Sequence, residues 1–408
     1  MWTNILWVIA GLSTVQAVML TVMQYESFRF TLSRLRARKR PRTPRYRSTA
    51  VIIPVSGNAE ALRTNLQAFF GLDHPNYQIL FSVETTDDPA VPVIDSLIRE
   101  NSHVRARLVV AGTTTGSGQK IHNLLAAWKA TSEDVEVLAF ADADIQPQAE
   151  WLDCLVEHLG EDRNLATTGY RWFVPSRSTL INLYVSSING LTTSLLGRHN
   201  WNLIWGGSWA VDRATFESAD IAENWPGTLS DDVVATRSVN ALNARIDFQP
   251  CCLSASAVDM DLKGALEFLN RQSMIVRMYS PGRWWSMIGF AALYEASYFC
   301  LASGVIYGIL SDGKLSLIPL FALLFTWCLG GVRSWMRQTA ARQSLPGECW
   351  RAGPAWFDFL FGQFLGVASL LLVVSSVLRH SMRWREFVYR MDRAGRIQSV
   401  ARVTRSAA

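Results

Sequence analysis

Residues 135–144 read Val-Glu-Val-Leu-Ala-Phe-Ala-Asp-Ala-Asp, an apolar run that ends in two carboxylates two positions apart. The run has the length and composition of a buried β-strand. In an extended backbone, residues i and i+2 point to the same face, so Asp142 and Asp144 can hold a hard divalent cation together. Acids after a strand also form turns or cap the next helix, and the pair alone leaves both interpretations open.

The segment around this strand alternates between short β-branched runs and stretches of helix length, from about residue 49 to residue 249. Residues 51–55 and 79–83 are two clear examples of such runs. Strands separated by helices predict an α/β fold with a mostly parallel sheet covered on both faces. Ligands of such folds bind beyond the carboxyl ends of the strands, which is where Asp142 and Asp144 are expected.

The beginning of the chain has the pattern of a membrane anchor. Residues 1–25 carry no charge, and residues 2–22 are long enough to cross a bilayer. A cleaved signal peptide is disfavoured because no basic region precedes the apolar run and no small-x-small pattern closes it. Nine Arg and Lys residues then follow between residues 29 and 47, without an acid from Ser27 to Asn58. Such a cluster marks the cytoplasmic side and suits anionic lipid headgroups.

The basic cluster lacks interleaved stacking aromatic residues, so we predict membrane lipids and no nucleic acid as its partner. The whole chain has a net charge of only +5. Its six cysteines form no CxxC pair and offer too few ligands at the right spacing for a zinc site. We predict buried, reduced thiols and a soluble part in the cytosol.

The last third of the chain holds three more candidate membrane segments, residues 284–310, 315–332 and 356–378. The first contains Glu295, which is compatible with an interfacial helix or with a carboxylate turned towards protein. One crossing plus three would place the tail outside, yet residues 379–408 hold eight Arg and two acids. Either the positive-inside rule fails here or one segment does not cross.

The predicted domains follow from these patterns. They are an anchor (1–25), a basic juxtamembrane segment (26–48), a cytosolic domain (49–283), a membrane region with two or three helices (284–378) and a basic tail (379–408).

Polar residues follow the first two predicted strands. Pro54 and Ser56 belong to a loop that can close over a base, and Glu84, Asp87 and Asp88 follow the second strand. A carboxylate at Glu84 or Asp87 can accept hydrogen bonds from uracil or ribose. Asp88 fits an Asx turn before the next proline as well as it fits a ligand.

Three further motifs complete the candidate site. Lys120 follows a Gly-Ser loop at a predicted helix start, where backbone N–H groups and an ammonium can face phosphate; a solvated surface lysine is the alternative. Gly207 and Ser208 form a turn that permits close approach to a sugar. Asp231 and Asp232 begin another helical pattern, where acids commonly cap the helix. The order of all these motifs along the chain favours a catalytic domain over a chance series of caps.

With these motifs in this order, the chain resembles the membrane-bound ceramide glucosyltransferases and their bacterial relatives, within the inverting glycosyltransferases of the family 2/21 type. The resemblance covers about residues 51–279 and the spans around them, and its most specific parts are residues 87–90, 118–124, 142–144, 207–208 and 230–232. It implies a GT-A type domain with transmembrane helices at both ends. Trp384-Arg385 and Tyr389-Arg390 are similar to a tail hairpin of the bacterial proteins.

The resemblance also implies a reaction. A hexose, glucose by resemblance, passes from a UDP-sugar to a lipid acceptor such as ceramide, with inversion in a single displacement. Mg²⁺ or Mn²⁺ is then expected on Asp144, with Asp142 on the metal or on the ribose of the donor. Asp232 is the expected general base and Asp231 its neighbour. Arg271 and Gln272 are expected to meet the diphosphate or the acceptor.

Two departures from the family pattern stand out. The (Q/R)xxRW element keeps Arg271, but Met274 and Ile275 replace the Arg-Trp pair, and Arg277 or Arg283-Trp284 can supply the missing cation. The family's histidine between the two acidic motifs has no clear counterpart.

Two alternatives therefore stay open, a processive polysaccharide synthase and a catalytically silent membrane scaffold that keeps the fold. We predict a multi-pass membrane protein whose catalytic domain faces the cytosol. No obligate protein partner is evident from the sequence.

Overall fold

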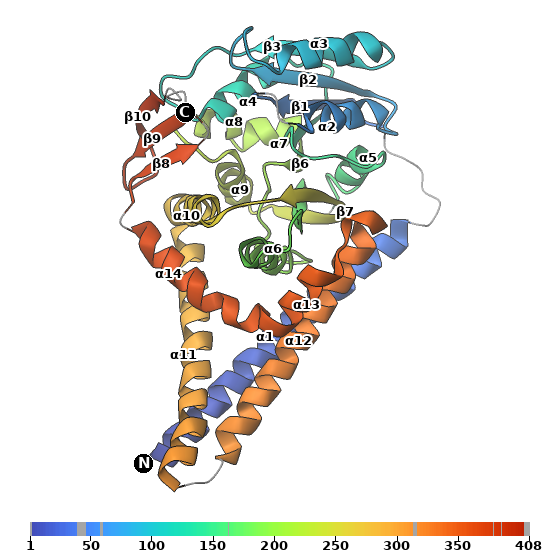
Figure 1. The fold of residues 1–408 in the computed structure, drawn as a ribbon. Coiled ribbons are helices and arrows are strands. Elements are labelled where there is room, and N and C mark those ends of the chain that lie inside the picture. The colour runs from blue at the N-terminus through green and yellow to red at the C-terminus, as the bar shows by residue number, and fades with distance from the viewer. Residues whose placement is uncertain are drawn as a thin grey trace. The chain divides into compact units, whose positions relative to one another are not determined.

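The computed structural model describes residues 2–38, 46–57, 60–161, 163–312, 316–377, 379–384 and 386–403 (Figure 1). Parts of the predicted basic segment (39–45) and of the tail (385 and 404–408) lie outside these residues. The chain forms two compact units. The helical unit comprises Met1–Ser33, Phe173–Gly197 and Ala257–Leu378, and the sheet unit comprises Arg34–Trp172, Arg198–Ser256 and Arg379–Ala408.

A seven-stranded sheet with the order β3-β2-β1-β4-β6-β5-β7 is the centre of the fold. Its strands are β1 (Thr49–Pro54), β2 (Tyr77–Val83), β3 (Arg105–Val110), β4 (Val137–Ala141), β5 (Asn164–Pro175), β6 (Ser208–Asp212) and β7 (Arg245–Val258). The first four are parallel, since β1 pairs in parallel with β2 and β4, and β2 with β3. β6 runs antiparallel to β4 and β5. The predicted α/β fold with a mostly parallel sheet is confirmed.

Helices cover this sheet and explain its apolar strands. The helices of the sheet unit are α2 (Leu62–Ala68), α3 (Val91–Glu100), α4 (Gln119–Lys129), α5 (Trp151–Val156), α7 (Arg213–Ser218), α8 (Ile221–Asn224) and α9 (Asp231–Ala241), with a 3₁₀ turn at Phe69–Gly71. Every residue of β2 and β4 is buried, as expected for strands covered on both faces. Phe140 of β4 stacks on Trp209 of β6 with ring centroids 4.3 Å apart.

The tail forms a small sheet of its own. β8 (Ser381–Trp384), β9 (Phe387–Met391) and β10 (Ile397–Arg402) are antiparallel in the order β10-β9-β8. These strands belong to the sheet unit, together with β1 to β4. The described part of the tail is therefore a docked element of that unit, visible beside α4 and α8 in Figure 1.

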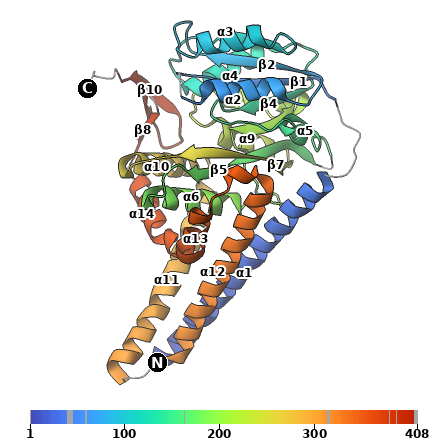
Figure 2. The same ribbon diagram turned by 45° about the vertical axis from the view of Figure 1, so that its right-hand side comes forward.

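The helical unit contains the long apolar helices. Its elements are the greater part of α1 (Trp2–Arg38), α6 (Leu180–Thr193), α10 (Leu262–Tyr279), α11 (Pro281–Asp312), α12 (Leu317–Ser344), α13 (Ala352–Phe361) and α14 (Leu365–Val377), with 3₁₀ turns at Gly347–Cys349 and Gly362–Phe364. Among the described residues, three helices are long and apolar enough to cross a membrane: Asn4–Arg38, Pro281–Ser311 and Leu317–Ser344. They lie side by side in Figures 1 and 2. Gln16 Nε2 donates to the Phe290 carbonyl, and Arg333 Nη1 donates to the Ala17 carbonyl, so both later helices contact α1.

The last apolar segment differs from a straight span. α13 and α14 are bent by 85° at the break between them. At 10 and 13 residues, each is shorter than the roughly 20 residues that cross a bilayer. α13 and α14 do not form one straight span.

The tail sheet bears on how the chain crosses a membrane. β8 to β10 and β1 to β4 belong to one compact unit. The described residues hold three helices that could cross a membrane by length and composition, or four if α13 and α14 form one broken span. The number of crossings and the side of the Arg-rich tail stay predictions.

Glu295 lies within α11 and is turned towards protein. Its side chain is buried, and its carboxylate lies so close to Gly366 of α14 that a Cβ there would collide with it. Of the two placements that the sequence left open, the structure shows the inward one.

A buried ion pair joins α12 to α13. Arg337 Nη2 lies 2.6 Å from Asp358 Oδ1, and both side chains are almost fully buried. Removing one partner strands the other charge, which typically costs about 3 kcal/mol or more. We expect Arg337→Met to lower the unfolding midpoint in detergent markedly, as followed by intrinsic fluorescence, and Arg351→Gln on the exposed start of α13 to leave it unchanged. Equal midpoints for the two variants would contradict the assignment.

Candidate active site

Lys120 joins two of the acidic motifs. Its ammonium lies 2.8 Å from Asp142 Oδ1 and 3.0 Å from Asp231 Oδ2. It also donates to the Gly206 carbonyl at 3.3 Å. Asp142 follows β4 directly, and its N–H donates to the Gly207 carbonyl at 3.2 Å. The structure therefore brings together the end of β4, the start of α4, the turn before β6 and the start of α9, as the sequence predicted for a single site.

The electrostatics of this cluster are those of a buried charge group. Burial alone would lower the pKa of Lys120, but the carboxylates of Asp142, Asp231 and Asp232 outweigh it and raise the pKa. Burial raises the pKa of Asp231 to about 6, with the Lys120 charge acting in the opposite direction. Lys120 is thus a protonated ammonium at neutral pH. The pKa of Asp231, about 6, lies close to neutral pH.

Asp232 has a different environment from Asp231. It is half-buried, and its Oδ1 accepts from Ser230 Oγ at 2.5 Å and from the Val233 N–H at 2.7 Å. Its Oδ2 accepts from the Gly206 N–H at 3.3 Å. Ser230 also caps α9, because its side chain accepts from the Val233 N–H. The acidic pair therefore lies in the first turn of α9, after the Ser230 cap, and at the same time belongs to the charge cluster.

Packing explains the glycines of the Trp205–Ser208 turn. A Cβ on Gly206 would lie 2.5 Å from Asp231 Oδ2 and 2.9 Å from Lys120 Nζ. A Cβ on Gly207 would overlap the Trp205 indole. Ser208 is fully buried, and its hydroxyl accepts from Trp151 Nε1 at 2.8 Å. These contacts give the turn a structural part in holding Lys120 and Asp231 together.

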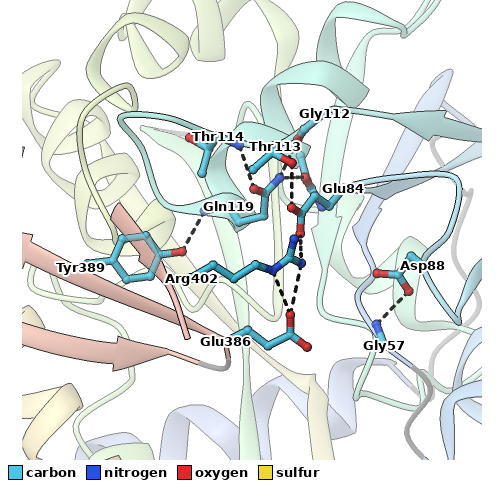
Figure 3. A network of polar contacts seen from close by, with 11 residues as sticks. Gly57, Glu84, Asp88, Gly112, Thr113, Thr114, Gln119, Glu386, Tyr389 and Arg402 are labelled. Carbon is cyan, nitrogen blue, oxygen red and sulfur yellow. Dashed lines mark hydrogen bonds and ion pairs between the residues drawn. The ribbon is translucent and has the colours of Figure 1, made fainter. Parts of the chain in front are cut away.

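Glu84 follows β2 and is buried in a polar network (Figure 3). Its Oε1 accepts from Thr113 Oγ1 at 2.9 Å, and its Oε2 accepts from Arg402 Nη2 at 3.1 Å. Arg402 is the last residue of β10, so the tail reaches this edge of the sheet. Gln119 holds the preceding loop, because its side chain accepts from the Thr114 N–H at 3.0 Å and donates to the Gly112 carbonyl at 2.9 Å.

Asp88 forms the turn that the sequence left as one of two possibilities. Its Oδ1 accepts from the Ala90 N–H and from the Gly57 N–H, both at 2.9 Å. Gly57 has a φ of 70°, a left-handed conformation that glycine adopts without strain. The Asp88 side chain thus links the two loops that follow β1 and β2. Pro54 ends β1 and is half-buried. The other three predicted residues, in the loops after β1, β2 and β4, are exposed: Ser56, Asp87 and Asp144.

Arg271 and Gln272 lie on α10, in the helical unit. The Arg271 guanidinium is 5.4 Å from the Phe268 ring centroid. Met274 and Ile275, which replace the family's Arg-Trp, are buried in this unit. The other predicted site residues belong to the sheet unit, whereas these two do not.

Two groups of residues could not be predicted from the sequence. The tail is joined to the edge of the sheet by Arg402, Tyr389 and Gln119. The similarity of Tyr389-Arg390 to a tail hairpin was the only sign of this contact in the sequence. The sulfur atoms of Cys154, Cys251 and Cys252 all lie within 4.8 Å of one another. Spacing could not reveal this cluster, because Cys154 belongs to α5 and the other two to β7.

The α/β sheet with this acidic carboxyl-end edge is that of a GT-A type glycosyltransferase. The model of Glycosyl transferase family 21 matches residues 14–397, and the chain belongs to this family.

Named relatives agree with this family. Ceramide glucosyltransferase 1 of Caenorhabditis elegans is 21% identical over 382 residues, which cover 91% of this chain and 78% of that protein. The ceramide glucosyltransferase of Komagataella phaffii is 27% identical over 122 residues, 29% of this chain and 24% of that protein. Among solved structures, a mannosyltransferase from Pyrobaculum calidifontis in complex with GDP-Man and Mn²⁺ has a TM-score of 0.47 at 15% identity, covering 90% of this chain and 98% of that one.

Proposed function

We propose that this glycosyltransferase transfers one hexose, glucose in the first instance, from a UDP-sugar to a lipid acceptor such as ceramide. The observation that carries the proposal is the cluster of Asp142, Lys120, Asp231 and Asp232 at the carboxyl-end edge of the sheet. Two relatives named ceramide glucosyltransferase support glucose and ceramide. The apolar helices that precede and follow the catalytic domain in the sequence support an acceptor that resides in a membrane.

The residues after β4 fit a divalent cation. Asp142 and Asp144 offer hard carboxylate oxygens, which suit Mg²⁺ or Mn²⁺. When bound there, the cation neutralises charge that develops on the leaving diphosphate. Lys120 contributes a fixed positive charge to the same place, and its three contacts hold the ammonium between the DxD motif and the start of α9.

Asp232 is the proposed general base. It takes the proton of the acceptor hydroxyl while the hydroxyl oxygen forms a bond to the anomeric carbon and the diphosphate leaves with its electron pair. Its half-exposed side chain supports this choice, since Asp231 is buried and paired with Lys120. Attack from the face opposite the diphosphate inverts the configuration of the anomeric carbon.

The alternatives differ in what they require. A processive synthase would need the (Q/R)xxRW element, and here Met274 and Ile275 are part of a buried core. A catalytically silent scaffold would not require an ammonium that links two acidic motifs.

We place the catalytic domain in the cytosol, on the side of the basic cluster and the tail.

The first test is release of UDP. Purified protein in detergent, with UDP-glucose, Mn²⁺ and ceramide, is expected to release UDP at a rate that depends on ceramide. Release that is the same without any acceptor, or no release at all, would count against the proposal.

The pH dependence supplies a second prediction. Because burial raises the pKa of Asp231 to about 6, this carboxyl is protonated below that pH and then no longer balances the Lys120 charge. We expect kcat/KM to be constant above pH 7 and to fall as the pH decreases through about 6. In Asp231→Asn the rate is lower throughout, and the fall near pH 6 is absent. An unchanged fall near pH 6 in this variant would show that another group titrates there.

A further inference from the structure

The tail sheet docks on the rest of the sheet unit at three places. Arg402 Nη2 lies 3.1 Å from Glu84 Oε2. The Tyr389 hydroxyl accepts from the Gln119 N–H at 3.3 Å, at the start of α4. The Ile397 N–H donates to the Gly227 carbonyl at 2.9 Å, shortly before α9. Each contact falls on a different loop of the enzyme.

These loops carry the residues of the proposed site. Gln119 precedes Lys120, and Gly227 precedes the Ser230–Asp232 cap by a few residues. The two loops are also bonded to each other, because the Gly118 N–H donates to the Thr228 carbonyl and the Gly227 N–H donates to Ser117 Oγ, both at 2.9 Å. The tail therefore contacts Glu84 and the two segments that lead to Lys120 and to the Ser230–Asp232 cap.

Glu84 depends on the tail for its charge partner. Its side chain is only 8% exposed, and a buried carboxylate without a partner is unfavourable. Among the described residues, Arg402 is the cation that forms an ion pair with it. Arg402 also lies 3.2 Å from Glu386 of the tail, so the guanidinium is held from two sides, as Figure 3 shows.

We propose that Arg402 is a positioning residue for the donor nucleotide, holding the Glu84 carboxylate oriented to accept a hydrogen bond from the nucleoside. The inference rests on the proposed function, in which Glu84 faces the base or ribose. Glu84 accepts one bond on each oxygen, from Thr113 and from Arg402, and a carboxylate accepts about four in all. A nucleoside can therefore bind while Arg402 stays in place, which favours a positioning part over a blocking one.

The test measures nucleotide binding by the full-length chain in detergent with Mn²⁺. We compare the Kd of UDP, GDP and ADP for the wild type, Arg402→Gln and Arg390→Gln by calorimetry. Arg390 is the matched control because it lies exposed on β9 of the same tail sheet. Since Arg402 is half exposed, we expect a moderate loss, about fivefold in the Kd of UDP for Arg402→Gln, and no change for Arg390→Gln. In the transfer reaction, the KM for the donor rises by a similar factor and kcat changes little.

A double-mutant cycle separates positioning from a general effect on folding. If Arg402 acts through Glu84, Arg402→Gln has little further effect on Kd in a chain that already carries Glu84→Gln. Two results would overturn this inference and leave the proposed function standing. One is additive losses in the double variant, and the other is an Arg402→Gln chain that binds UDP at least as tightly as the wild type. A wild type that binds GDP or ADP in place of UDP would correct the proposed donor. The ratio of the Kd of Arg402→Gln to the Kd of the wild type, measured with that nucleotide, would then decide the inference. A wild type that binds none of the three would overturn both.

Discussion

Asp232→Asn is expected to lower kcat for hexosyl transfer by about 10³-fold while the chain still binds UDP with its normal affinity. The amide keeps the size of the side chain, and its oxygen can still accept from the Val233 N–H, but it loses the second acceptor that faces the Gly206 N–H and it cannot take a proton. General base catalysis contributes roughly 10²-fold to 10⁴-fold to a rate. Single-turnover measurement of product, with UDP binding by calorimetry in parallel, separates the chemical step from donor binding.

The matched control is Asp220→Asn. Asp220 is exposed in the turn between α7 and α8 of the same unit. Its backbone is left-handed, which asparagine tolerates well. This variant is expected to keep the wild-type rate. A slow Asp220→Asn enzyme, or an Asp232→Asn enzyme within a few fold of the wild type, would contradict the assignment of the base.

Lys120→Met is expected to lower kcat/KM by about 100-fold and also to destabilise the protein. Without the ammonium, Asp142 and Asp231 face each other as like charges, and Asp231 is left as a buried carboxylate without its partner. Breaking a buried pair in this way typically costs about 3 kcal/mol, and the loss of a preorganised positive charge at the diphosphate accounts for a similar loss in rate. The unfolding midpoint and the initial rate of UDP release measure the two effects.

Two further variants separate these effects. Lys120→Arg keeps the charge and is expected to retain most of the stability. The double change Lys120→Met with Asp231→Asn removes the stranded charge, so the midpoint recovers while the rate stays low. A double variant that is as unstable as Lys120→Met would show that Asp231 is not the source of the destabilisation.

The sequence was most informative where a residue pattern and its physical cause are local. The strand at residues 135–144 and its alternation with helices predicted the parallel sheet, because buried strands need apolar side chains on both faces. The acidic residues that follow β2 and β4 were predicted to share one edge, since parallel strands end at the same side. The apolar segments 284–310 and 315–332 correspond to α11 and α12.

What the sequence could not supply were contacts between distant segments. Hydropathy gave no sign that the apolar segment 356–378 contains a break with a bend of 85°, or that the tail belongs to the same unit as β1 to β4. Arg402 is 318 positions from Glu84, and no local pattern predicts such a pair. Ser208 looked available to a sugar, but its hydroxyl is buried against Trp151, because the neighbouring strands place it inside the core.

The most direct test of the account is the identity of the lipid product. We would express the wild type and Asp232→Asn in a host that lacks glycosylated ceramides, analyse the lipids by mass spectrometry, and determine the anomeric configuration by NMR. The account predicts a ceramide that carries a single hexose in the β configuration, made by the wild type and absent with Asp232→Asn. A ladder of longer saccharides, an α-linked product, or no new glycolipid from the wild type would contradict it.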